Sequence, residues 1–139
     1  MVQFSLASMR DDGATNRVVM IGNSGYLGET DVYLKYLEDG YVRLYGSNVS
    51  EQNGWKKLSE LVLEPGVYTL TGMNKVPEKV IALQLRIRIG TDKYQYLYQN
   101  DEDVSFVVDR PADAVLHVMV YPNVEKIDVK ARPAVYKDG

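Results

Sequence analysis

The chain has 139 residues, of which 45% are hydrophobic and 25% charged, and its net charge is −3. This length suits one domain with a buried core, and the composition is that of a globular domain rather than of a disordered, collagen-like or coiled-coil chain. The acidic balance disfavours nucleic acid as a partner. Because cysteine is absent and histidine occurs once, disulfide scaffolds, thiol catalysis and cysteine zinc sites are excluded, and a multi-histidine metal site has little room.

The N-terminal segment, residues 1–30, is rich in Gly, Ser, Asn and Asp between short apolar runs such as Val18 to Ile21. No hairpin partner for these runs lies within the segment, and Gly22 to Gly28 predicts a loop. Residues 1–12 lack the regions of a signal peptide, and no apolar run is long enough to span a membrane. We predict an arm over residues 1–30 that adds to a neighbour's sheet edge or lies along a partner surface. We also predict a folded domain over residues 31–139 and no membrane partner.

The segment Val32 to Tyr45 contains two β-rich runs around Asp39 and Gly40. Asp-Gly supplies the positive φ angles of a tight turn, so this segment predicts a hairpin. Residues 53–64 fit either a helical turn or a loop followed by a strand, and Trp55 is expected in a polar loop. Leu63 to Gly66 is a Pro-Gly turn, after which residues 67–71 predict a strand.

Residues 83–89 alternate strictly, with aliphatic side chains on one face and Gln84, Arg86 and Arg88 on the other. Tyr94, Tyr96 and Tyr98 share one side of the next run, residues 93–99. The connecting loop decides which face the tyrosines join. A loop of two or four residues puts them on the buried face with Ile89, whereas a loop of three puts them beside the arginines. An aromatic stripe beside an aliphatic one is usually sheet core, so the buried register is favoured.

Further short strands are predicted at residues 104–108, 114–121 and 126–132, with a polar tail after Pro133. His117 falls on the face opposite Leu116 and Val118, as a structural or surface histidine. Turn signals separate short strands along the whole domain. The pattern is typical of an all-β fold, an antiparallel β-sandwich or jelly roll with at most one short helix.

Four segments in this order resemble small β-sandwich modules of phage and prophage structural proteins, whose fold is similar to carbohydrate-binding jelly rolls. They are EDGYVRLYGSNVS (Glu38 to Ser50), LVLEPGVYTLTG (Leu61 to Gly72), DVSFVV (Asp103 to Val108) and VEKIDVKARPAVYKDG (Val124 to Gly139). The resemblance implies a non-catalytic virion protein, either a capsid decoration or a tail-associated module. Its implied partners are other virion proteins, further copies of itself and a cell-surface glycan.

Glycan binding would need aromatic planes beside planar hydrogen-bond donors. The expected ligand-binding residues are Trp55, Arg86, Arg88, Tyr94, Tyr96 and Tyr98, with the amides of Gln84 and Gln95 as further donors. Trp55 either stacks on a ligand or closes one end of the sandwich. We expect no catalytic residue, no metal and no cofactor. The alternatives are a purely structural capsid or tail cementing protein and, less favoured, a glycan hydrolase.

Overall fold

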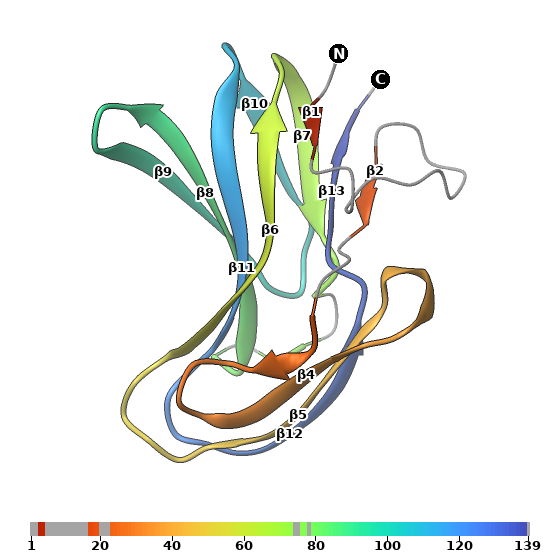
Figure 1. The fold of residues 1–139 in the computed structure, drawn as a ribbon, viewed down its shortest axis with the longest axis vertical. Coiled ribbons are helices and arrows are strands. Elements are labelled where there is room, and N and C mark those ends of the chain that lie inside the picture. Colours follow the sequence, from red (N-terminus) through yellow and green to blue (C-terminus); the bar gives the residue numbers. More distant parts are fainter. Residues whose placement is uncertain (1–2, 5–16, 20–22, 74–75, 78, 139) are drawn as a thin grey trace.

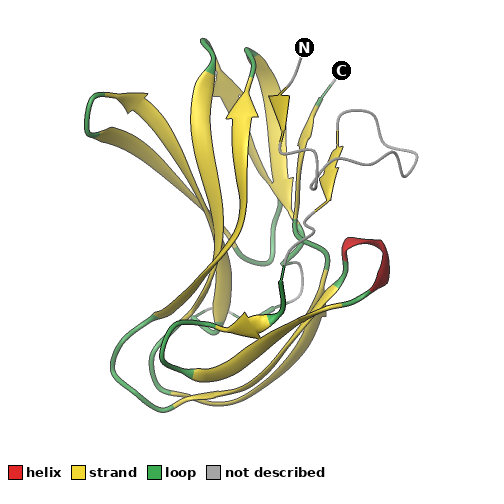
Figure 2. Cartoon of the chain, in the orientation of Figure 1, coloured by secondary structure: helices red, strands yellow, loops and turns green. Residues whose placement is uncertain are grey.

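The computed structural model describes residues 3–4, 17–19, 23–73, 76–77 and 79–138, which form an all-β sandwich of antiparallel sheets (Figure 1). The predicted fold class is confirmed. In this part of the chain the helical structure is limited to a 3-10 turn at Glu38–Gly40 (η2), drawn in red in Figure 2.

The largest sheet is five-stranded, with the order β1-β6-β11-β8-β9, and is called here the five-stranded sheet. Its strands are β1 (Gln3–Phe4), β6 (Gly54–Leu63), β11 (Ala112–Val120), β8 (Ile81–Gly90) and β9 (Lys93–Gln99). Leu83, Leu85 and Ile87 of β8 are buried on one face, as their alternation predicts. This buried face is turned to the core, and the opposite face is called the outer face.

A four-stranded sheet with the order β10-β7-β13-β2, called the β7 sheet, lies behind the five-stranded sheet in Figure 1. Its strands are β10 (Val104–Val108), β7 (Gly66–Thr71), β13 (Ala134–Lys137) and β2 (Arg17–Val19). The prediction of a polar tail after Pro133 is wrong, because Val135 is fully buried and β13 pairs with β7. A strand this short, paired on both sides, lacks the long alternation of polar and apolar residues by which strands are recognised in sequence.

A second four-stranded sheet, the β5 sheet, has the order β12-β5-β4-β3 and lies across the lower part of Figure 1. Its strands are β12 (Val124–Ala131), β5 (Val42–Asn48), β4 (Asp31–Tyr36) and β3 (Gly25–Tyr26). The predicted Asp-Gly turn joins β4 to β5, with φ angles of 58° at Asp39 and 79° at Gly40. The hairpin prediction is confirmed.

One apolar cluster joins the sheets. Its largest fully buried side chains come from every sheet and include Leu34, Leu44, Tyr68, Leu70, Leu83, Leu85 and Leu116. Burial of this apolar surface is the main term that stabilises the sandwich.

Described residues of the segment 1–30 pair with this chain's own sheets. β1 pairs with β6, β2 with β13, and β3 with β4. Of the predicted loop Gly22 to Gly28, residues 25–26 form β3 and Leu27 is fully buried, while Gly22 lies outside the described residues. The division into an arm over 1–30 and a domain over 31–139 stays a prediction, and residues 1–2, 5–16 and 20–22 of the segment lie outside the described ones.

The segment 53–64 is a strand rather than a helical turn. β6 begins at Gly54 and pairs with β11 along its length, so Trp55 lies on a strand and not in a loop. A β-bulge at Leu58 explains the ambiguous pattern, because the register shifts where His117 faces Lys57 and Leu116 faces Ser59. A bulge adds one residue to one strand and so interrupts the strict alternation of faces.

The favoured register of the β8–β9 hairpin is wrong, and the tyrosines join the arginines. Arg88 pairs with Tyr94 and Arg86 pairs with Tyr96, so these side chains share the outer face. The same register places Gln84 opposite Tyr98.

The reason is a second β-bulge. Thr91 and Asp92 form a turn closed by Gly90 and Lys93, which by itself would give the buried register. The pairing shifts by one residue between Arg88 and Gly90, and the extra residue, Ile89, is 60% exposed. A shift of one residue turns the whole strand over relative to its partner.

Candidate functional site

All of the predicted ligand-binding residues lie on the outer face of the five-stranded sheet. Trp55 comes from β6, the arginines from β8 and the tyrosines from β9, and β11 lies between β6 and β8. The rings are accessible: the exposed fractions are 37% for Trp55, 37% for Tyr94, 49% for Tyr96 and 51% for Tyr98. The fold therefore brings together residues that are about forty positions apart in the sequence.

The tyrosines and arginines form a contiguous cluster. The Arg86 guanidinium lies 4.9 Å from the centre of the Tyr94 ring, within the range of a cation–π interaction. The rings of Tyr94 and Tyr96 are 6.3 Å apart and tilted by 48°. These contacts hold aromatic planes and a planar donor side by side on β8 and β9.

Gln84 links this cluster to the centre of the sheet. Its Nε2 donates a hydrogen bond of 3.0 Å to the Tyr98 hydroxyl, and its side chain is only 8% exposed. On the next strand, β11, His117 pairs in register with Gln84 on one side and with Lys57 of β6 on the other. The exposed rings thus flank a polar floor made of the covered Gln84, the half-buried His117 and the exposed Lys57.

Trp55 contacts that floor from the β6 side. Its ring lies 6.0 Å from the His117 ring in an edge-to-face arrangement. Met119 pairs with Trp55 and is buried, and Asn53 Nδ2 donates to its sulfur at 3.3 Å. Trp55 therefore lies on the outer face rather than closing an end of the sandwich.

His117 is the member of this face that the sequence did not assign to it. The alternation of residues 114–121 correctly predicted its face, but nothing in the sequence shows that β11 lies between β6 and β8. Burial lowers the pKa of His117 below 6.5, and the positive charges of Arg86 and Lys57 lower it further. Its Nδ1 is buried without a hydrogen-bond partner among the described residues. These surroundings favour the neutral form of the imidazole.

The β-bulge beside His117 also shapes the sheet. In Figure 1 the lower parts of β6 and β11 sweep toward the left, the same side as the tip of the β8–β9 hairpin. Bulges bend a strand and increase its twist.

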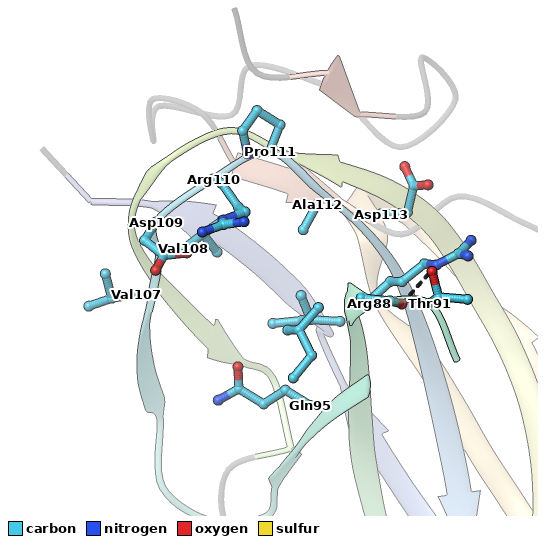
Figure 3. Close-up of a pocket in the computed structure, with 13 residues that line it drawn as sticks. Arg88, Thr91, Gln95, Val107, Val108, Asp109, Arg110, Pro111, Ala112 and Asp113 are labelled. Atoms are coloured by element: carbon cyan, nitrogen blue, oxygen red, sulfur yellow. Dashed lines mark hydrogen bonds between the residues drawn. The ribbon is translucent and has the colours of Figure 1, made fainter. Parts of the chain in front are cut away.

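A separate cleft of about 880 Å³ opens between the β8–β9 hairpin and the loop joining β10 to β11 (Figure 3). Its lining includes Ile87, Arg88, Gln95, Val108, Arg110 and Asp113. Of the predicted ligand-binding residues only Arg88 lines it, and its Nε donates to the carbonyl oxygen of Gly90 at 3.3 Å. Gln95, predicted as a donor beside the arginines, lines this cleft instead because it pairs with Ile87 on the inner face.

Within the described ranges, no group of three or more histidine, aspartate or glutamate side chains is placed to hold a metal ion. The acidic residues at positions 11 and 12 lie outside those ranges. No helix of the described part is long and apolar enough to cross a membrane. Compared with known proteins, the chain matches no family model, no curated protein and no solved structure.

Proposed function

We propose that the chain is a non-catalytic glycan-binding module and that the outer face of its five-stranded sheet is the binding site. The proposal rests on one observation. Trp55, the tyrosine row of β9 and the guanidinium groups of β8 all lie on the same accessible face. Sugar rings stack their C–H faces on aromatic planes, and their hydroxyl groups accept hydrogen bonds from guanidinium and amide groups. The face offers both kinds of contact.

The size of the face suits an oligosaccharide. Tyr98 on β9 and Lys57 on β6 are separated by three strand spacings, or about 14 Å, with Gln84 and His117 between them. Trp55 lies on the same face, two residues before Lys57. A ligand that contacts both the tyrosines and Trp55 must therefore contain several sugar units.

The chemistry of this face favours binding without catalysis. Glycoside hydrolysis uses a pair of carboxylic acids at a defined separation. The register places the carboxylates of Glu60 and Asp113 on this face, and Glu60 is ion-paired with Lys57 at 3.2 Å. The groups in contact with Trp55 and the tyrosines are rings, a guanidinium group, an amide and an imidazole. An open face with few enclosed contacts binds weakly. Many copies on one particle would convert weak binding into strong adhesion, which agrees with the virion protein that the sequence resemblance implies.

The test is an array of neutral glycans probed with the intact protein and with three variants. Tyr96→Ala and Trp55→Ala should each abolish the array signal, and Tyr26→Ala should retain it, because Tyr26 is 59% exposed but belongs to the β5 sheet. Tyr96→Ala should lower the unfolding free energy by well under the about 3–5 kcal/mol expected for the buried Tyr68→Ala. No array signal from the intact protein would overturn the proposal and favour the purely structural cementing role.

A further inference from the structure

A second surface of aromatic and basic side chains lies on the exposed face of the β5 sheet, away from the glycan site. Two register rows cross its strands. In one row Lys35 of β4, Arg43 of β5 and Lys130 of β12 lie side by side. In the neighbouring row Tyr26, Tyr33, Tyr45 and Asp128 follow one another across β3, β4, β5 and β12. We call these two rows, together with Tyr41 and Arg132, the tyrosine–cation face.

Positive charge dominates this face although the chain as a whole carries −3. Asp128 is the only carboxylate of the two rows, and both of its oxygens accept hydrogen bonds of 2.9 Å from Arg43. Asp31 lies on the same side of the sheet, one row beyond Tyr33. Lys35 and Lys130 have no ion-pair partner among the described residues. A positively charged surface on a chain whose net charge is negative indicates an anionic partner.

The tyrosine rings are packed so that cations cover their faces. Arg43 lies 4.4 Å from the centre of the Tyr45 ring, and Lys130 and Arg132 lie 4.8 Å and 5.5 Å from that of Tyr41. Covered ring faces are poor platforms for stacking nucleic-acid bases.

The remaining tyrosines of the row pack against one another. Tyr26 meets Tyr33 edge to face at 5.0 Å, and Tyr33 lies 5.8 Å from Tyr45. Tyr26 is 59% exposed. The rings thus offer edges and hydroxyl groups, both of which suit anionic oxygens.

We propose that the tyrosine–cation face binds an anionic polysaccharide that lies across the strands. Neighbouring strands are about 4.8 Å apart, which is close to the length of one pyranose unit. A chain with a carboxylate on each sugar can therefore meet Lys35, Arg43 and Lys130 with successive units, while its sugar edges lie along the tyrosine row. This site is independent of the outer face of the five-stranded sheet.

The test uses the full chain and polygalacturonate, with dextran as the uncharged polymer and poly-glutamate as the polyanion without sugars. Polygalacturonate should bind best, with an affinity that falls as salt rises. Lys35→Gln/Lys130→Gln should lower the affinity about tenfold and reduce the slope of log affinity against log salt by about 2.

The matched control is Lys79→Gln/Lys93→Gln, which removes two exposed lysines outside this face and should bind like the wild type. Tyr96→Ala should also bind polygalacturonate normally, which separates this site from the proposed glycan site. Unchanged binding by the Lys35/Lys130 variant, an equal loss in the control, or no binding by the wild type would overturn the proposal. Equal or tighter binding of poly-glutamate or single-stranded DNA would overturn it as well.

Discussion

Gly46, in the middle of β5, is the position where a single methyl group should damage the β5 sheet most. Its φ angle is 128°, a region that residues with a side chain rarely adopt. A Cβ atom there would overlap the carbonyl oxygen of Asp31 and lie 2.9 Å from its carbonyl carbon and 3.1 Å from Val32 Cα. All of these atoms are backbone of β4, so no side chain can move aside.

The expected cost of Gly46→Ala follows from two contributions. Holding alanine in this region costs about 1–3 kcal/mol, and moving β4 away weakens one or two ladder hydrogen bonds at about 1 kcal/mol each. We expect a loss of about 2–5 kcal/mol in unfolding free energy, which lowers the melting temperature by about 7–17 °C. Because Gly46 pairs with Val32 and lies beside Tyr45, the tyrosine–cation face should be disturbed too.

Urea unfolding followed by circular dichroism measures this loss as a shift in midpoint at constant slope. Gly25→Ala is the matched control, because its Cβ would meet only the flexible Lys56 ammonium at 3.4 Å, and it should change stability by less than about 0.5 kcal/mol. If Gly46→Ala costs less than about 1 kcal/mol, β4 and β5 do not approach each other as the structure shows.

Three further predictions concern single side chains. Tyr36→Phe should leave the unfolding free energy unchanged or raise it by up to about 1 kcal/mol. The reason is that the Tyr36 hydroxyl is buried without a partner among the described residues, and burial raises its pKa to about 12. A clearly lower melting temperature of the variant would reveal a hydrogen bond. The unfolding free energy should fall as pH drops below 6.5, because the unfolded chain takes up a proton at the ordinary histidine pKa while folded His117 takes it up only at lower pH. Urea titrations at pH 7 and pH 5 measure this change. In His117→Gln this part of the pH dependence should vanish. Gly40→Val should cost about 1 kcal/mol or more, since its φ of 79° resists a β-branched side chain, and a melting temperature equal to that of the wild type would contradict this.

Local chemistry was sufficient to predict many of the strands. The bounds expected for residues 93–99 and 104–108 agree with β9 and β10, and the Asp39-Gly40 turn lies where its dipeptide predicts. These features depend on backbone preferences and on the alternation of neighbouring residues, which are contained in a few consecutive positions. The all-β class follows from the same information.

The candidate site depended on information that alternation does not contain. The tyrosines of β9 face outward only because Ile89 bulges out of β8, and one extra residue in one strand leaves the pattern of the other unchanged. Trp55 and His117 meet because β6 and β11 pair, although these residues are more than sixty positions apart. Pairing between distant strands is selected by burial of the whole core rather than by local preference.

The tyrosine–cation face shows the same division. The sequence by itself determined that Tyr33, Lys35, Arg43 and Tyr45 alternate with apolar residues, and hence that they leave the core together. Only the tertiary structure decided that β12 joins this hairpin and sets Lys130 beside Arg43. An edge strand pairs with the distant segment that best completes the buried face. That choice depends on the free energy of the entire sandwich, and local sequence does not contain it.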